Sequence, residues 1–350
     1  MLNLIKATNF DTYRTCGHSS VVERLVANEK VEGSTPFARS IINMFKLNTL
    51  TIVLQKLLDN KDIRYFKKSF FYYIFFRLVR TFLKEDIIIK IYNFKVFGSI
   101  NKSSTSHALL KKCEFGDYHE LNTIKKFSKK KKIFLIDCGC NYGFYSFFTA
   151  SLSQENIVIS LEASQKVSNF FLRNLKLNNF DNISFINKAI SNEDEKELSF
   201  NESMNDWESS LSHNQFKISE VSKVKSIKID TILKTKRLEN YYLFIKLDIE
   251  GHEIKVIEGA LKTIEKFSPI IIIEFSKYIF DNKVNIDYLN HFLNSYDYEI
   301  YDTSNLKIKL NEILFKIKNL DKDHKTIGNY YLIKRTSILE KLFVNYDRTC

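Results

Sequence analysis

The stretch FLIDCGCNYGFYSF, residues 134–147, constrains the fold more than any other part of the sequence. An apolar run ends at Asp137, glycines follow at Gly139 and Gly143, and an aromatic-rich amphipathic segment comes next. This order predicts a buried strand, a tight glycine-containing turn and a helix, which is how α/β proteins hold nucleotide-like ligands. We therefore expect a ligand site at this turn.

The spacing of the glycines argues against two common phosphate-binding turns. A dinucleotide fingerprint requires G-x-G-x-x-G, but Asn141 stands at the second glycine position and Phe144 at the third. The turn also lacks the G-x-x-x-x-G-K-[ST] pattern of a P-loop. D-x-G-x-x-x-G is instead typical of S-adenosylmethionine binding, where glycines let the backbone pass beneath the amino-acid part of the ligand. A strand–turn–helix that binds no ligand is the alternative.

An acidic residue follows the second predicted strand. Glu162 comes directly after IVISL, about twenty-five residues beyond Asp137. An acid at this position is suited to accept hydrogen bonds from both ribose hydroxyls of a nucleoside. The segment NKAIS, residues 187–191, follows the third strand and places Ala189 where an adenine edge would lie.

The fourth predicted strand carries a concentration of ionisable groups. In FIKLDIEGHEIKVIEGA, Lys246, Asp248 and Glu250 alternate at the carboxyl end of the strand before Gly251 turns the chain into a helix. Open α/β sheets bind ligands outside the carboxyl ends of their strands. Charged groups in so apolar a neighbourhood are costly unless they are used or paired. The structural alternative is a Lys–Asp salt bridge with a glutamate that caps the helix.

Strands and helices alternate along the rest of the chain, which predicts a parallel sheet with right-handed crossovers. We expect the last two strands, about 297–303 and 328–335, to pair as a hairpin without a helix between them and to add an antiparallel edge strand. The expected strands are 133–137, 157–161, 183–186, 243–248 and 270–275, the expected helices are 117–127, 143–152, 164–178 and 252–265, and a hairpin or cap strand is expected at 86–98.

Taken together, these segments resemble the FkbM-type methyltransferases. The matching pieces run in the family's order over residues 115–280 or so: LIDCGCNYGFYSF, SLEAS, NKAIS, IKIDTIL, IKLDIEGHEIKVIEGA and PIIIIEFS. The resemblance implies the class I methyltransferase fold, an α/β Rossmann-like arrangement with a seven-stranded, mostly parallel sheet and an antiparallel C-terminal strand. It also implies S-adenosylmethionine as cofactor and an O-methyltransferase that acts on a hydroxyl of a sugar, a glycan or a similar natural product.

The resemblance also implies roles for individual residues at the cofactor. Asp137, Gly139, Asn141 and Gly143 would line the methionine part, and Glu162 would hold the ribose.

At the reacting end, Asp248 and Glu250 would face the methyl group and the acceptor. Asp248 is our first choice for the base, Glu250 the second and His252 the third. Glu274, which ends the fifth strand, is suited either to bind the acceptor or to support the turn at 251–253. Asp248, Glu250 and Glu274 could gather a hard cation, but the family does not demand a metal and we expect none.

Three regions are expected along the chain. Residues 17–39 contain SSVVER and GSTP, which resemble a translated tRNA gene, so residues 1–43 are interpreted as an over-extended gene start or a disordered leader before Met44. Residues 44–114 would form a helical and cap-strand extension, and residues 115–340 the S-adenosylmethionine-binding domain. Within the extension, residues 64–84 form either an interfacial membrane helix or a helix packed on the main domain.

The polar stretch at 192–226, which includes the only tryptophan, Trp207, is expected to be a lid or an acceptor-binding loop.

Composition bears on partners and location. The net charge is +12, yet Lys, Asn, Ile, Phe and Tyr are abundant and there are only 9 Gly and 2 Pro, a skew typical of an AT-rich genome. The run KKKK at 129–132 is therefore interpreted as a solvated loop. The fourth strand is followed by LDIEG rather than the [DNS]-P-P-[YFW] of base methylation, so we expect no nucleic-acid partner.

The open alternatives are a nucleic-acid or other small-molecule methyltransferase and a non-catalytic S-adenosylmethionine-binding module. Five scattered cysteines without zinc-site spacing, no signal peptide and no run of 18 apolar residues indicate the cytoplasm. Peripheral contact with the inner membrane would come through residues 64–84.

Overall fold

A computed structural model of the chain describes residues 87–98, 117–203, 218–320 and 326–345. All of them belong to one compact unit of the chain, Gln55–Cys350. The leader at 1–43, the segment at 64–84 and Trp207 lie outside the described residues. What the sequence predicts for them therefore stays a prediction.

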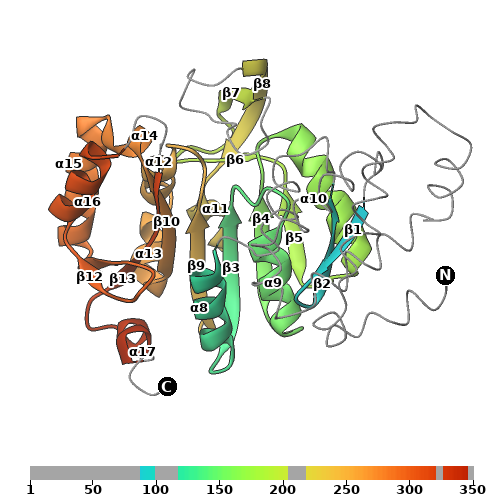
Figure 1. Cartoon of the computed structure of the whole chain (residues 1–350), viewed down its shortest axis with the longest axis horizontal. Helices are drawn as coiled ribbons and strands as arrows, with labels where there is room; N and C mark the ends of the chain where they lie inside the picture. Colours follow the sequence, from blue (N-terminus) through green and yellow to red (C-terminus); the bar gives the residue numbers. More distant parts are fainter. Residues whose placement is uncertain (1–86, 99–116, 204–217, 321–325, 346–350) are drawn as a thin grey trace, which may run out of the picture. The chain divides into compact units, whose positions relative to one another are not determined.

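The central sheet has the strand order β12-β11-β13-β10-β9-β3-β4-β5 (Figure 1). β3 pairs with β4 on one side and with β9 on the other, so the order of the strands reverses at β3. Ligands of such sheets bind outside the carboxyl ends at this point of reversal. The parallel strands are β3 (Lys132–Cys138), β4 (Ile157–Leu161), β5 (Ile183–Ile186), β9 (Tyr241–Leu247) and β10 (Ile270–Ser276).

The antiparallel part of the sheet confirms the expected fold and corrects one detail of it. β13 (Thr326–Lys334) is antiparallel to both β10 and β11 (Tyr298–Tyr301), and the two-residue β12 (Lys307–Ile308) adds a short edge to the seven expected strands. The predicted antiparallel pairing of the last two strands is present, but β13 lies between β10 and β11, and the edge of the sheet is β12 rather than a strand of the predicted hairpin. The successive buried residues of β13, Tyr330, Tyr331, Leu332 and Ile333, need cover on both faces of the sheet.

The segment between β11 and β13 also differs from the prediction, since it contains a helix, α16 (Leu310–Lys318). Apolar residues at 310, 313, 314 and 317 follow helical spacing and form one face. Glu312 accepts a hydrogen bond from the backbone N–H of Lys309 at 3.2 Å, which satisfies a free donor at the start of the helix.

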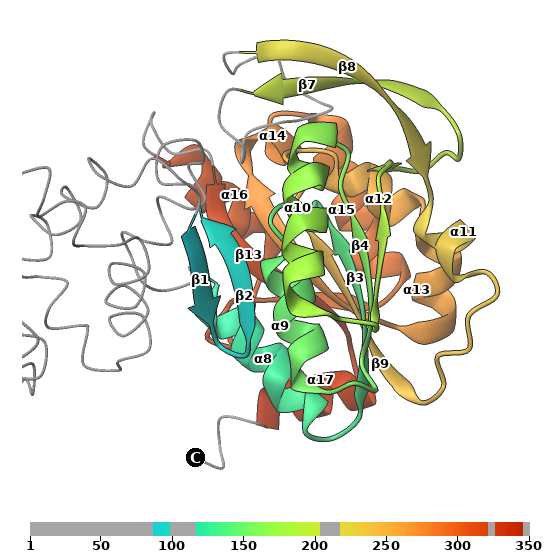
Figure 2. The ribbon, with the colours of Figure 1, turned by 90° about the vertical axis from the view of Figure 1, so that its right-hand side faces the viewer.

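Helices cover both faces of the sheet (Figure 2). The expected helix at 252–265 is two helices that meet at Gly259, where a Cβ would lie 2.2 Å from the backbone oxygen of Ser191. One face carries α8 (Tyr118–Ser128), α9 (Phe144–Leu152), α10 (Gln165–Asn178) and α17 (Ile338–Asn345); the other carries α11 (Ile229–Leu233), α12 (Glu253–Glu258), α13 (Leu261–Phe267), α14 (Lys277–Phe280), α15 (Lys283–Ser295) and α16.

The expected hairpin before the main domain is β1 (Ile87–Ile91) paired with β2 (Phe94–Gly98). It packs on α10, where the side-chain oxygen of Asn174 accepts the backbone N–H of Phe97 at 2.7 Å. The side chain of Asn178 bonds to both the N–H and the C=O of Lys95. The hairpin is thus held on α10 by hydrogen bonds between its backbone and two asparagine side chains.

The described parts of the polar stretch at 192–226, on either side of residues 204–217, contribute two strands to a second, small sheet. β7 (Glu197–Ser203) is antiparallel to β8 (Ile218–Ile227), and β8 also pairs with β6 (Ala189–Ile190). Val221, Lys223 and Lys225 occupy alternate positions of β8 and all three are exposed, so one face of this strand lies in solvent. Figures 1 and 2 both show the β7–β8 pair beyond the carboxyl edge of the central sheet. A role as a lid stays a prediction.

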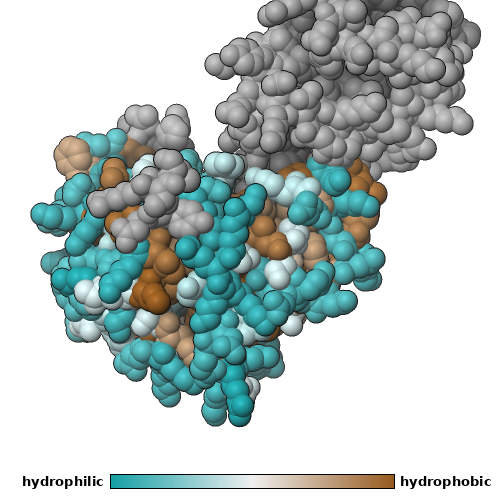
Figure 3. All heavy atoms as spheres, turned by 90° about the horizontal axis from the view of Figure 1, so that it is seen from below, coloured by the Kyte–Doolittle hydropathy of each residue, from teal (hydrophilic) through white to brown (hydrophobic). Residues whose placement is uncertain are grey.

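In the part of the chain that the structure describes, no helix combines the length and the apolar character needed to span a bilayer. Figure 3 shows the side of the molecule that faces down in Figure 1, where hydrophilic residues predominate and hydrophobic ones form separate areas.

Candidate active site

The turn after β3 closes directly onto the end of β9. Gly139 has a φ of +74°, and a Cβ at this position would lie 2.1 Å from the backbone oxygen of Asp248. The backbone N–H of Asp248 donates to the oxygen of Cys138 at 3.3 Å. Only glycine fits this close approach, so the turn and the acidic strand end form one site.

Glu162 joins the second strand to the same turn. One carboxylate oxygen accepts the backbone N–H of Asn141 at 3.1 Å, and the other accepts that of Ser164 at 2.9 Å. Burial raises the pKa of Glu162 to about 7, and these two backbone donors limit the rise. Each carboxylate oxygen can accept a further hydrogen bond. The pairing of turn and acid expected from the sequence is therefore present.

Asp137 lies beneath the turn rather than on its surface. Its side chain is 2% exposed, and the hydroxyl of Ser146 donates to it at 2.5 Å. Burial raises its pKa to about 6, while Ser146 and then Lys246 oppose the rise. Gly143 forms the N-cap of α9 with a φ of +90°. Ala189 is buried in β6, where its backbone pairs with β8.

Lys246 is a buried cation at the centre of a polar network. It is 1% exposed, and its Nζ donates to Asp248 at 3.2 Å and to the side-chain oxygen of Asn329 at 2.9 Å. Burial alone would lower its pKa, but the charges of Asp248, Asp117 and Glu274 outweigh burial and hold the pKa above its usual value. Lys246 therefore stays protonated, and the predicted Lys–Asp salt bridge is present.

Three carboxylates gather beside this lysine. Asp248, Glu250 and Glu274 each place one oxygen within 4.8 Å of the others. Glu250 has a φ of +55°, which is a costly backbone conformation for a glutamate, and the next residue, Gly251, has a φ of +101°. Burial, and then the charge of Asp248, raises the pKa of Glu274 to about 8. The structure thus brings together two of the three predicted catalytic residues and adds Glu274.

His252 is turned toward a different partner. Its Nε2 lies 2.9 Å from the hydroxyl of Ser191. Burial, and then the charge of Lys255, lowers its pKa to about 4. The imidazole is therefore neutral and only weakly basic, which makes it the least suited of the three candidate bases.

Glu253 is a buried carboxylate that the sequence interpretation missed. It is 1% exposed, and its Oε1 accepts the backbone N–H groups of Ile249 and Gly251 at 3.1 and 3.2 Å. Burial raises its pKa to about 7. An acid in the first helical turn after a glycine was the signal that could have identified it.

Unlike Asp248, the other neighbours of Lys246 had no signal in the sequence. Asn329 lies on β13, which reaches Lys246 because β13 inserts next to β10. On the other side of the network, the hydroxyl of Tyr145 donates to Asp117 at 2.8 Å, and the Tyr145 ring centroid lies 5.3 Å from Lys246 Nζ. No local motif links positions so far apart in the chain.

Residues 137–300 match the family model of the methyltransferase FkbM domain. The chain carries an FkbM methyltransferase domain. The matched range includes the turn after β3, Glu162 and the acidic end of β9, so the resemblance noted from the sequence is confirmed.

Solved structures with some likeness to the chain are also methyltransferases. Methyltransferase FkbM from Methylobacillus flagellatus is 17% identical with a TM-score of 0.35, covering 64% of this chain and 52% of its own. The precorrin-6y C5,15-methyltransferase of Geobacter metallireducens is 11% identical with a TM-score of 0.31, and the likeness covers 61% of this chain and 84% of the Geobacter chain. TYW2 of M. jannaschii, solved with AdoMet, is 13% identical with a TM-score of 0.34, and the likeness covers 71% of this chain and 84% of the TYW2 chain.

This chain therefore spans about half the length of the Methylobacillus protein. No curated protein matches the sequence. At these TM-scores the likenesses carry no argument about function.

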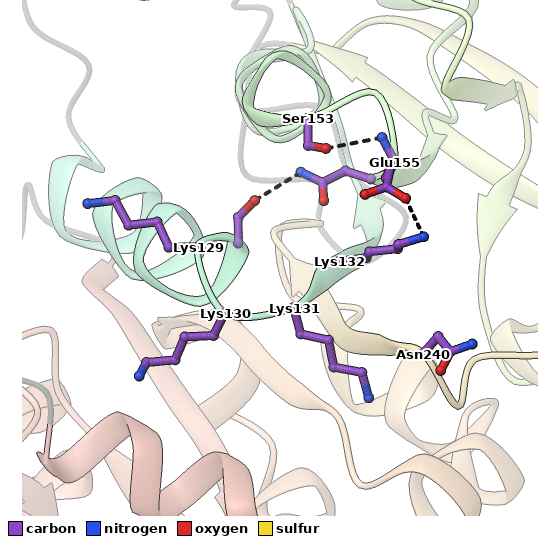
Figure 4. Close-up of a pocket in the computed structure, with 9 residues that line it drawn as sticks. Lys129, Lys130, Lys131, Lys132, Ser153, Glu155 and Asn240 are labelled. Carbon is purple, nitrogen blue, oxygen red and sulfur yellow. Dashed lines mark hydrogen bonds and ion pairs between the residues drawn. The ribbon is translucent and has the colours of Figure 1, made fainter.

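A basic hollow of about 450 Å³ lies near the amino-terminal ends of the strands of the central sheet (Figure 4). Lys129, Lys130 and Lys131 point away from one another there. Lys132 forms an ion pair with Glu155. Because its cations diverge, the hollow does not resemble an anion site, and the run at 129–132 fits the solvated loop expected from the sequence.

Proposed function

We propose that this protein is an S-adenosylmethionine-dependent O-methyltransferase that methylates a hydroxyl of a sugar, a glycan or a similar natural product. The observation that carries the proposal is the contact of Glu162 with the backbone of Asn141 in the turn after β3. This contact supports the proposal because a carboxylate suited to accept from a ribose diol lies beside a turn in which Gly139 leaves no room for a side chain.

In this proposal the cofactor lies along the carboxyl ends of β3 and β4. The turn of Gly139, Asn141 and Gly143 lines its methionine part. Both oxygens of Glu162 accept the ribose hydroxyls, and the backbone near Ala189 borders the adenine. Asp137 supports the turn from below through Ser146.

The acceptor lies beyond β9 and β10 in the same proposal. S-adenosylmethionine supplies an activated methyl group when it is bound. The protein must align the acceptor hydroxyl with that methyl group and take its proton as the new bond forms. Asp248 and Glu250 are placed for this role, and Lys246 holds Asp248 in position. An alcohol is a weak acid, so the gathering of carboxylates supports a hydroxyl acceptor.

The cofactor half is tested by calorimetry on the full chain with S-adenosylmethionine and S-adenosylhomocysteine. Two hydrogen bonds to a charged group are worth about 3 kcal/mol or more together, so Glu162→Ala should weaken binding by about a hundredfold. Glu155→Ala, at the opposite edge of the sheet, is the matched control and should bind normally. Absence of binding to the folded wild-type protein would contradict the proposal.

The acceptor half is tested with methyl-labelled cofactor and a panel of sugars, glycans and nucleic acids. The proposal is supported if the wild-type protein transfers label to a sugar hydroxyl and the Asp248→Asn variant does not. Label on RNA or DNA would favour the nucleic-acid alternative. Cofactor binding without transfer to any member of a broad panel would favour the non-catalytic module.

A further inference from the structure

We propose that Glu202 on β7 is a positioning residue for the cofactor site: through the hydroxyl of Ser164 it holds the carboxylate of Glu162 against the turn after β3. In this role Glu202 acts on its neighbours rather than on the ligand itself. The positioning can be measured without a cofactor, whereas its effect on cofactor binding rests on the proposed function.

The alternation of side chains along β7 turns Glu202 inward. Leu198, Phe200 and Glu202 occupy alternate positions and therefore share one face of the strand. Phe200 is 5% exposed and Glu202 8%, whereas Ser199 on the opposite face is exposed. The register between β7 and β8 shifts directly after Glu202, and such irregularities re-aim side chains near functional sites. An acid on the buried face of a strand is costly unless it is used or paired.

Ser164 is the residue that Glu202 reaches across from the small sheet. The Ser164 hydroxyl donates to Oε2 of Glu202 at 2.7 Å and accepts the backbone N–H of Val167 at 3.2 Å. Ser164 is fully buried and is the N-cap of α10. A hydroxyl has a single proton, so the bond to Glu202 fixes its direction and leaves the lone pairs for the start of the helix. The contact therefore joins the β7–β8 pair to α10 (Figure 2).

The backbone of Ser164 in turn orients Glu162. Its N–H donates to Oε1 of Glu162 at 2.9 Å, while the N–H of Asn141 donates to Oε2 at 3.1 Å. The side chain of Asn187 donates to the backbone oxygen of Glu162 at 2.8 Å and so holds the main chain. The direction of the carboxyl group then depends on Ser164 staying in place. Glu202 thus acts on Glu162 through one intervening residue.

Glu202 also acts on Glu162 through its charge. Burial is the main cause of the raised pKa of Glu162, and the charge of Glu202 adds to the rise. Cys140, in the turn after β3, is also a titratable group that faces Glu162, but burial raises the pKa of its thiol well above the usual value, so it stays neutral. The hydrogen bond of Glu202 should favour cofactor binding, whereas its charge favours the protonated form of Glu162. Substitutions can separate these two effects.

The first measurement is hydrogen exchange of single amides, followed by NMR on the full chain without cofactor. Glu202→Ala removes the acceptor for Ser164, so the amides of Asn141 and Ser164 should exchange at least about fivefold faster. Glu202→Gln keeps an oxygen that can accept the same hydrogen bond and should preserve most of the protection. Glu197→Ala, on the same strand but exposed and paired with Lys223, is the matched control and should change neither amide.

The second measurement is calorimetry with S-adenosylhomocysteine at two pH values. At pH 8, where Glu162 is largely ionised, Glu202→Ala should weaken binding by about tenfold and Glu202→Gln by less than about twofold. At pH 6, Glu202→Gln should bind at least about twofold more tightly than the wild-type protein, because removal of the charge lowers the pKa of Glu162. A residue that only supports the fold would not shift the pH dependence in this way.

A double-mutant cycle with Ser164→Ala tests the route of the effect. Once Ser164 has lost its hydroxyl, Glu202→Ala should weaken binding little further. Near-ultraviolet circular dichroism establishes that each variant is folded.

Unchanged exchange of the Asn141 and Ser164 amides in Glu202→Ala would overturn the proposal, as would fully additive losses in the cycle. Faster exchange in Glu202→Ala together with no cofactor binding by the wild-type protein would support the positioning and contradict the proposed function. The failure of one is therefore distinguishable from the failure of the other.

Discussion

At the scale of single residues, the raised pKa of Glu162 has a direct consequence for cofactor binding. Burial holds that pKa at about 7, and in the proposed complex the ribose hydroxyls donate to the ionised form. Binding therefore releases a proton below pH 7, and affinity should rise by up to about tenfold per pH unit there and level off above it. Calorimetry at pH 6, 7 and 8 measures this. Equal affinity at all three values would show that the cofactor does not engage the Glu162 carboxylate.

Gly139 and Gly328 form a matched pair for testing the contact between the turn and β9. Both have positive φ, but a Cβ at Gly139 meets Asp248, whereas one at Gly328 has no atom within 4 Å. Gly328→Ala should cost only the backbone strain, about 1 kcal/mol. Gly139→Ala should cost at least about 2 kcal/mol more, because the strands must separate. Urea unfolding of both variants compares the two costs, and equal losses would contradict the close approach.

At the scale of elements, Asn174 on α10 links the β1–β2 hairpin to the turn after β3. Its side chain accepts the N–H of Phe97 and donates to the oxygen of Tyr142. Asn174→Ala leaves both groups without a partner and should destabilise the fold by about 1–3 kcal/mol. Hydrogen exchange should show lost protection at Phe97. Asn178→Ala, which breaks more exposed bonds to Lys95, should cost less.

How far the sequence predicts these elements depends on how local their signals are. β3, β4 and β5 are short apolar runs bounded by turns, and their observed limits agree with the predicted ones to within a residue. The apolar residues of α16 follow helical spacing in the sequence, but the lysines around them gave the segment the character of a loop. The position of β13 had no local signal, since the order of strands is decided by packing between distant segments.

The residues of the candidate site likewise divide into those with a local signal in the sequence and those without one. Asp137 and Asp248 end predicted strands and Glu162 follows one, so their meeting at one edge of the sheet could be foreseen. Asn329 and Asp117 could not, because they reach Lys246 through β13 and the start of α8 rather than through any motif.

At the scale of the whole molecule, buried acids make stability depend on pH. Burial raises the pKa of Asp137 to about 6 and that of Glu162 to about 7, above their usual values of 3.8 and 4.5. The stability that these two groups contribute is fully present below the usual pKa values and is lost as pH rises through the pKa values of the folded protein. The free energy of unfolding should therefore fall by a few kcal/mol between pH 4.5 and pH 7.5. Urea titrations across this range measure it, and a rise would contradict the assignment.

The placement of Asn329 on β13 also has a consequence during synthesis. Lys246 receives this partner from a position 83 residues further along the chain. A nascent polypeptide could thus form the turn after β3 while still attached to the ribosome, but the network around Lys246 would stay unfinished until β13 had been synthesised and had left the ribosome. Fragments released early by a premature stop would carry the means to hold a cofactor without the complete machinery to use it.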